Sequence, residues 1–107
     1  MNDFRDREKG EERKFAMDAD TAFRVAARRN RLLGHWAAEK MGLSPEETAA
    51  YAKAVIQADF EEAGDEDVIR KVLGDLISAG CDVDDAGVRA ALEAKSIEAK
   101  RQLMSES

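Results

Sequence analysis

The chain is poor in the residues that most often carry catalysis or covalent cross-links. It has one cysteine, Cys81, and one histidine, His35, so neither an internal disulfide nor a histidine pair or triad can form. A lone thiol fits a reducing, cytoplasmic compartment. We expect His35 to be a partly exposed helix residue and Cys81 a structural or incidental thiol, and we expect no enzymatic activity.

Long apolar runs, glycine-rich loops and a basic excess are also missing. No stretch approaches the roughly 18 apolar residues of a membrane span, and the N-terminus lacks the apolar core of a signal peptide. The glycines do not form a phosphate-binding loop. A formal net charge of -6 disfavours general nucleic-acid binding, which needs a basic surface. These absences predict a protein that neither inserts into membranes nor binds nucleic acid.

The sequence does contain clear start and stop signals for helices. Ser44 is a good N-cap, Pro45 suits the first helical position, and Glu47 completes a capping box. Gly42 and Gly80 are placed to end helices. The predicted helices cover residues 19–41, 45 to about 64, 65 to about 79, and 84 to about 104.

Apolar residues recur at helical spacing in all four segments, and no strand pattern or internal repeat is evident. The third helix has the broadest apolar face, from Val68 to Ile77, and is predicted to be the most central. Trp36 and Phe60 are interpreted as core residues. Because the connections are short, neighbouring helices should be antiparallel. The 107 residues therefore predict an all-α fold, a four-helix bundle over residues 18–107.

Residues 1–17 differ from the rest, because charges of both signs surround two large aromatic residues. Phe4 and Phe15 are eleven residues apart, about three helical turns, so a helix would place them on one face. An isolated helix this polar is marginal in water. The segment is interpreted as a flexible arm that becomes helical on a partner. The alternative is a frayed extension of the first helix.

A local basic cluster stands out in this acidic chain. It consists of four arginines in eight residues, namely Arg24, Arg28, Arg29 and Arg31. On a helix, Arg24, Arg28 and Arg31 share a face and could grip a phosphate, with weak binding of ADP or ATP as the consequence. The simpler interpretation is pairing with the acidic residues between the second and third helices.

Two further charge patterns need comment. Asp82, Asp84, Gly87 and Glu93 occupy positions 1, 3, 6 and 12 of an EF-hand loop. However, Ala86 at position 5 offers no side-chain oxygen, and Asp84 suits the N-cap of the last helix. No metal site is expected. In the third helix, Glu66 with Arg70 and Asp67 with Lys71 have the favourable acid-before-base spacing for ion pairs.

Several long runs make the chain recognisable. They are FRDRE at Phe4–Glu8, KFAMD at Lys14–Asp18, ARRNRLLGHWAAEKMG at Ala27–Gly42 and YAKAVIQADFEEAGDEDVIRKV at Tyr51–Val72. With these runs the chain resembles the zeta subunit, the ATPase inhibitor subunit, of alphaproteobacterial F1FO-ATP synthase. The resemblance covers nearly the whole chain.

The resemblance implies a regulatory subunit whose arm, residues 1–17, enters a catalytic interface of F1 and blocks ATP hydrolysis. It implies the α, β and γ subunits of F1 as partners, no required cofactor, and a cytoplasmic location, peripheral at the inner membrane through F1. The expected contacts with F1 are Phe4, Arg5, Arg7, Glu8, Lys14 and Phe15.

The arm departs from the family pattern at Glu11, where strong inhibitors carry an aromatic residue. An aromatic there would complete one stripe with Phe4 and Phe15, whereas a buried carboxylate is costly unless a cation meets it. Gly10 weakens the helix further, by about 1 kcal/mol relative to alanine. We expect weaker inhibition than in the strongest family members. The alternatives are an F1-binding zeta homologue with little inhibition, and a small nucleotide-binding regulatory bundle that uses the four arginines.

Overall fold

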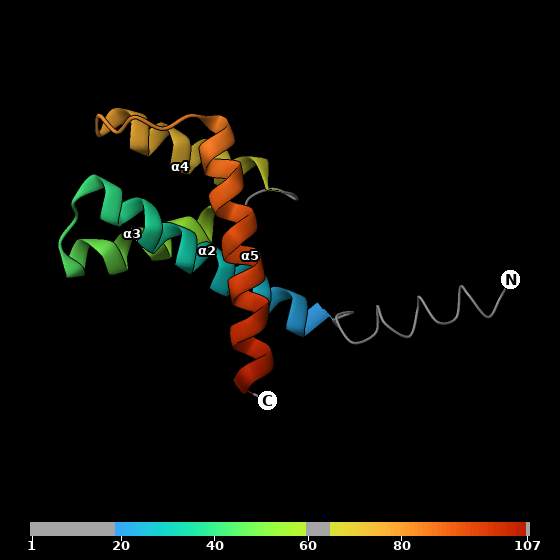
Figure 1. Cartoon of the computed structure of the whole chain (residues 1–107). Coiled ribbons are helices and arrows are strands. Elements are labelled where there is room, and N and C mark those ends of the chain that lie inside the picture. Colours follow the sequence, from blue (N-terminus) through green and yellow to red (C-terminus); the bar gives the residue numbers. More distant parts are fainter. Residues whose placement is uncertain (1–18, 60–64, 107) are drawn as a thin grey trace, which may run out of the picture.

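The computed structural model describes residues 19–59 and 65–106, which form four α-helices and no strand. The helices are α2 (Ala19–Met41), α3 (Pro45–Ala58), α4 (Glu66–Ser78) and α5 (Asp85–Glu106) (Figure 1). The predicted all-α, four-helix fold is thus confirmed. The prediction that the second helix ends near Gly64 was wrong, since α3 ends at Ala58 with Asp59 as its C-cap. Phe60 and the predicted arm lie outside the described residues.

The helix ends follow the local signals in the sequence. The Glu47 backbone N–H donates to Ser44 Oγ at 3.1 Å, and the Ser44 N–H donates to Glu47 Oε1 at 2.9 Å, so the capping box is confirmed. Pro45 occupies the first turn of α3, where its missing N–H costs nothing. Gly42 and Gly80 follow α2 and α4 with φ of 72° and 84°, which favours glycine at both positions.

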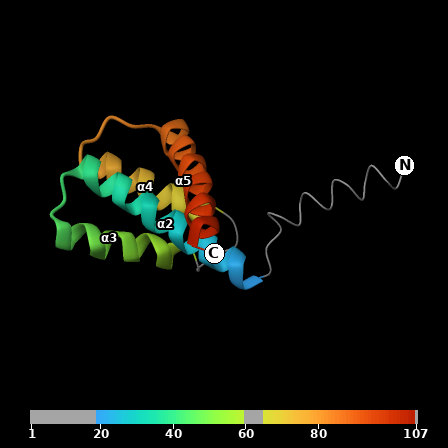
Figure 2. The same ribbon diagram turned by 60° about the horizontal axis from the view of Figure 1, so that its bottom comes forward.

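Helices α2 and α3 form an antiparallel hairpin (Figures 1 and 2), as the short connection predicted. The two helices approach each other closely at Gly34. A Cβ at Gly34 would lie 2.7 Å from Ala52 Cα, and Ala52 is 3% exposed. Two small residues therefore meet where larger side chains would hold the helix axes apart.

The central helix is α2, and the prediction that the third helix is the most central was wrong. Although α4 also contacts the three other helices, the interfaces of α2 with α3 and with α5 are the most extensive in the described part of the chain. The small residues of α2, which add little to an apolar pattern, allow this packing. The largest fully buried apolar side chains are Leu33, Leu76, Val55, Val68, Val72 and Val88.

Helix α5 is not antiparallel to α4 but crosses the other helices steeply (Figures 1 and 2). After Gly80 the chain runs back along α4 as far as Asp84, and only then does α5 begin. The Cys81 thiol donates a hydrogen bond to the Lys40 carbonyl at 3.4 Å, which ties this connection to the end of α2. The extended connection thus frees α5 from the hairpin geometry that a tight turn would impose.

Two residues of the predicted apolar stripes lie at the surface. Phe23 is 54% exposed and Ile77 is 57% exposed. Phe23 belongs to the first turns of α2, which extend past α5 at one end of the molecule (Figure 1). Trp36, in contrast, is partly buried against the core, and Lys40 Nζ lies 5.2 Å from its ring centroid.

We predict that Gly34→Ala destabilises the fold. The new methyl group would collide with the Ala52 backbone, and overpacking of about 1–3 kcal/mol outweighs the gain in helix propensity of about 1 kcal/mol. The matched control is Gly74→Ala in α4, where no atom lies within 4 Å of the added Cβ. Urea denaturation should show a lower free energy of unfolding for the first variant and an equal or higher one for the second. Equal stabilisation by both would contradict the close approach.

Candidate binding site on α2 and α5

The structure divides the four arginines of α2 between two environments. Three of them, Arg24, Arg28 and Arg31, line one shallow, open depression between α2 and α5, as their helical spacing predicted. Arg29 points elsewhere, toward the junction of α3 and α4. The cluster that looks continuous in the sequence is therefore two separate features.

Arg29 holds the junction of α3 and α4. Its side chain is 12% exposed, and its guanidinium lies 3.0 Å from the Asp65 carboxylate and 3.5 Å from the Asp59 carboxylate. Its Nε donates to Oδ1 of the buried Asn30 at 3.0 Å. Internal pairing with the acidic junction is thus confirmed for Arg29, which leaves it little freedom to bind a ligand. Within the described residues, Asn30 Nδ2 finds no hydrogen-bond partner.

The depression between α2 and α5 has a volume of about 300 Å³ and mixed chemistry. Arg28 pairs with Glu106 and donates to Gln102 Oε1 at 3.3 Å, while Arg24 pairs with Asp20 at 3.3 Å. Arg31 makes no ion pair within the described part of the chain. The lining residues are Phe23, Arg24, Ala27, Arg28, Arg31, Ile56, Leu103 and Glu106. An anion that binds Arg28 here would compete with Glu106.

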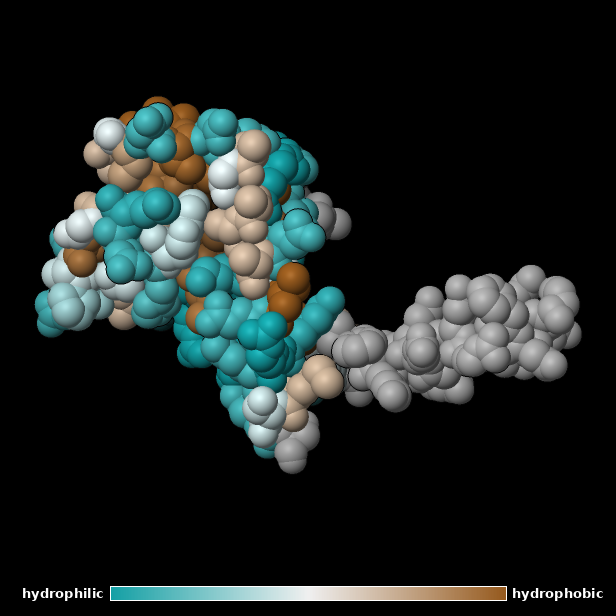
Figure 3. All heavy atoms as spheres, in the orientation of Figure 1, coloured by the Kyte–Doolittle hydropathy of each residue, from teal (hydrophilic) through white to brown (hydrophobic). Residues whose placement is uncertain are grey.

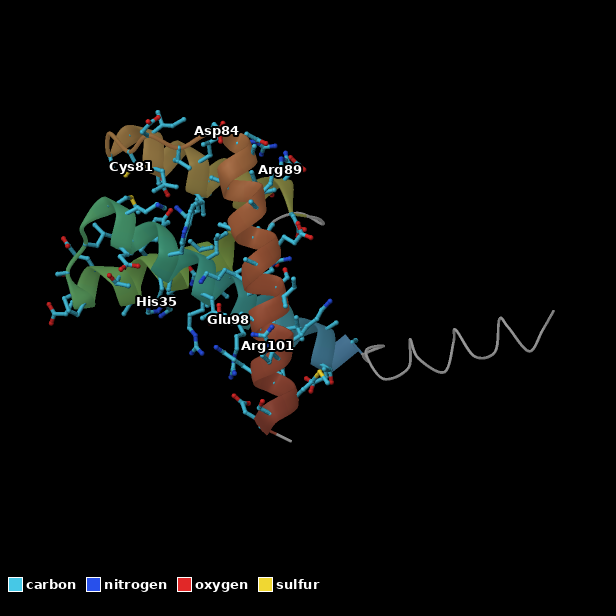
Figure 4. The ribbon with its side chains drawn as sticks, viewed as in Figure 1. His35, Cys81, Asp84, Arg89, Glu98 and Arg101 are labelled. Carbon is cyan, nitrogen blue, oxygen red and sulfur yellow. The ribbon has the colours of Figure 1, made fainter. Side chains whose placement is uncertain are left out.

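The EF-hand resemblance has no structural counterpart. Asp84 caps α5, since its Oδ1 accepts the Gly87 N–H at 2.9 Å, and residues from Asp85 onward are helical. Among the described residues, no cluster of three histidine, cysteine or acidic side chains could hold a metal ion. Figure 4 shows Asp84 and Arg89 together at the beginning of α5, with His35 of α2 far from both. His35 is exposed, as expected.

The expected ion pairs within α4 do not form. Arg70 pairs with Asp67 at 2.9 Å instead, while Glu66 reaches across to Arg89 of α5 at 2.8 Å. The hydrogen bond and the charge of Arg89 lower the pKa of the Glu66 carboxyl from its usual range. The stability from this pair is therefore present at neutral pH and is lost as the pH falls through that lowered pKa. Spacing along one helix could not reveal a partner on another.

Sequence reasoning also missed a polar cluster between α3 and α4. The Tyr51 hydroxyl donates to Asp75 Oδ2 at 2.8 Å, and Lys71 Nζ lies 3.1 Å from the same carboxylate oxygen. Burial, followed by the hydrogen bond to Asp75, raises the pKa of the Tyr51 hydroxyl. All three groups satisfy one another, so the cluster joins two helices rather than offering a free reactive group.

The other predicted site residues cannot be placed. The contacts expected with a partner, Phe4, Arg5, Arg7, Glu8, Lys14 and Phe15, lie outside the described residues. Of the helices in the described part, none is long and apolar enough to cross a membrane.

Comparison with known proteins identifies the family. A family model described as ATPase inhibitor subunit zeta matches residues 1–102. A protein solved by solution NMR is 53% identical in sequence, with a TM-score of 0.70 over 79% of this chain and 96% of that chain. No curated protein matches. The chain belongs to the ATPase inhibitor subunit zeta family.

We predict that Arg29 contributes to stability far more than Arg24 does. Arg29→Ala leaves the Asp59 carboxylate, which is 14% exposed, without its cation, and should cost about 2–3 kcal/mol. Arg24→Ala removes a pair in which both side chains are well exposed, and should cost less than about 1 kcal/mol. Thermal and urea unfolding of both variants measure the difference. Similar losses would refute the structural role of Arg29.

Proposed function

We propose that this chain is a non-catalytic regulatory subunit that binds the F1 sector of ATP synthase and inhibits its ATP hydrolysis. The observation that carries the proposal is the extent of the family match, which runs over residues 1–102 and thus includes the arm, α2, α3, α4 and most of α5. As an F1-bound subunit the chain lies on the cytoplasmic side of the inner membrane, as a peripheral component.

In this proposal the two parts of the chain have different tasks. Residues 1–17 enter a catalytic interface and contact the α, β and γ subunits of F1. Phe4 and Phe15 supply apolar anchors on one helical face, and Arg5, Arg7, Glu8 and Lys14 meet charged groups around them. The first turns of α2 extend past α5, so a segment that continues from Ala19 starts at an exposed end of the molecule (Figure 1). That position supports insertion of the arm without steric interference from the helices.

The test is ATP hydrolysis by the cognate F1. We expect the full chain to inhibit, a protein lacking residues 1–17 not to inhibit, and Phe4→Ala/Phe15→Ala to raise the half-inhibitory concentration by about tenfold or more, because truncated aromatic anchors often cost over 1.4 kcal/mol. Glu11→Phe should strengthen inhibition. Since the helices are unchanged in the aromatic variant, it separates loss of contact from loss of fold. Undiminished inhibition without residues 1–17 would rule out the arm as the inhibitory element.

A second candidate function, weak binding of ADP or ATP, is favoured by one observation. Arg24, Arg28 and Arg31 come together in one open depression of about 300 Å³ that also exposes apolar surface. The guanidinium groups suit phosphate oxygens. Arg29, the fourth arginine of the predicted set, is held by Asp59 and Asp65 and is not part of this candidate site.

An NMR titration with ADP tests this candidate. Binding should give saturable shifts in the first half of α2, and Glu106→Gln should tighten it roughly two- to fivefold, because a surface ion pair of about 0.5–1 kcal/mol no longer competes for Arg28. Glu93→Gln, an exposed change of the same charge on α5, is the control and should leave affinity unaltered. Chemical shift changes that do not saturate would rule out specific nucleotide binding at this depression.

A further inference from the structure

Helix α5 carries apolar residues on two opposite sides. Val88, Leu92 and Ala99 are buried against the other helices. On the opposite side, Ile97 is 53% exposed and Met104 is 55% exposed. Figure 3 shows tan and brown atoms along α5, bordered by teal. These two side chains therefore leave apolar surface open in the described part of the chain.

Two cations lie between Ile97 and Met104 on this side of α5. Lys100 and Arg101 follow Ile97 by three and four residues and precede Met104 by four and three, so the four side chains are neighbours on the helix surface. They line one open depression, and neither cation forms an ion pair with a described residue. These four residues are called the α5 outer patch. It presents unpaired positive charge beside apolar surface in a chain of net charge -6.

Residues 4–15 show the complementary pattern in the sequence. A helix turns by about 100° per residue, so Phe4, Glu8, Glu11, Glu12 and Phe15 fall within an arc of about 100°. The basic residues of this segment all fall outside that arc, and they are Arg5, Arg7, Lys9, Arg13 and Lys14. A helical arm thus has an acidic face between two aromatic residues. Its carboxylates are costly to bury unless cations meet them.

The spacing of the arm matches that of the α5 outer patch. Glu11 and Glu12 precede Phe15 by four and three residues, and the two cations of the patch precede Met104 by the same intervals. Parallel packing of the arm on α5 therefore brings both carboxylates level with both cations while Phe15 covers Met104. The arm also covers Ile97, which lies about two turns further along α5.

The arm can reach the α5 outer patch from the beginning of α2. Arg28 of α2 pairs with Glu106 in the last turn of α5, and Phe23 lines the depression that Glu106 also lines. Ala19 precedes Phe23 by four residues, a helical rise of about 6 Å. Residues 16–18 join the arm to α2 and bridge up to about 13 Å when extended. This length is sufficient for the arm to turn back onto α5.

We propose that in the protein without F1, residues 4–15 pack as a helix on the α5 outer patch, in a closed state that covers the acidic and aromatic face of the arm. The contact itself needs no partner. Its consequence rests on the proposed function, because the covered face carries Phe4 and Phe15, the anchors for F1. The closed protein must open before it inhibits, so the closed fraction lowers its apparent affinity for F1.

A second copy of the chain is a less suitable occupant of the α5 outer patch. A symmetric contact between two copies would place Lys100 and Arg101 of one patch against the same cations of the other. Like charges at such a contact repel each other. The arm, in contrast, offers carboxylates at the matching spacing.

Paramagnetic relaxation of the full-length chain without F1 tests the closed state. A nitroxide is attached to Asn2→Cys in a Cys81→Ser background, which removes the single native thiol. Asn2 precedes Phe15 by thirteen residues, so the parallel register places the nitroxide level with residues 90–94. Amide signals of residues 90–94 should be attenuated more than those of residues 101–106, which lie nearer the beginning of α2. An open arm gives the reverse order or no attenuation.

Matched variants in the nitroxide-bearing chain identify the surface that the arm contacts. Arg101→Glu should lower the ratio of closed to open protein about two- to fivefold, because an exposed ion pair is replaced by repulsion. Lys53→Glu makes the same charge change at an exposed residue of α3 and should leave the attenuation unaltered. Ile97→Gln should also favour the open state, whereas Ile77→Gln, a similarly exposed change in the last turn of α4, should not. Thermal unfolding of these exposed-site variants should leave the midpoint close to that of the parent.

Three results would overturn the closed state. The first is attenuation that is strongest on α2 rather than at residues 90–94, and the second is an equal response to Arg101→Glu and Lys53→Glu. The third comes from a mixture of nitroxide-bearing chain with isotope-labelled chain that has no nitroxide. Attenuation in this mixture would assign the contact to a second copy.

A covalent lock tests the consequence for inhibition. Glu12→Cys and Arg101→Cys, again with Cys81→Ser, are joined within one chain by a short bis-maleimide. The locked protein should not inhibit ATP hydrolysis by F1, whereas the same protein without the cross-link should inhibit. Inhibition by the locked protein would overturn the regulatory consequence. Failure of the parent protein to inhibit would overturn the proposed function and this consequence, while the nitroxide measurement still decides the closed contact.

Discussion

The close approach of α2 and α3 at Gly34 and Ala52 is the constraint on which the rest of the structure depends. With a Cβ position only 2.7 Å from the opposing backbone, the hairpin is tighter than larger residues would permit. That proximity brings the end of α3 to Arg29, whose guanidinium reaches Asp59 from α2. The same guanidinium meets Asp65 at the beginning of α4. A contact between two small residues thus determines where three helices meet.

The distribution of cations follows from the acidity of that junction. Asp59, Asp65, Glu66 and Asp67 stand within nine residues, and their mutual repulsion would disfavour a compact junction. Each of these acidic residues forms an ion pair with an arginine. Arg29 pairs with Asp59 and Asp65. Glu66 pairs with Arg89 of α5, and Asp67 pairs with Arg70 of α4. Arg29 is therefore a structural residue, whereas Arg31, Lys100 and Arg101 form no ion pair with a described residue.

The features that could be predicted from the sequence are those in which the interacting residues lie close together along the chain. The ends of helices at Gly42, Ser44 and Gly80 were predicted correctly, because caps are decided by residues within four positions. The shared face of Arg24, Arg28 and Arg31 was also predicted, since helical periodicity alone fixes it. Pairing between helices was anticipated only for Arg29 with the acidic junction, from the local excess of charge and not from helical spacing.

The errors have a common cause. Glu66 binds Arg89, 23 residues later, rather than Arg70, and Arg28 binds Glu106, 78 residues later. The prediction that α4 is the central helix followed from its broad apolar face. The glycine and alanine residues of α2 allow closer packing, which an apolar pattern does not reveal. The roles of Phe4, Phe15 and their charged neighbours remain predictions, because those residues lie outside the described structure. Composition and spacing thus specify local structure, whereas tertiary partners require the fold.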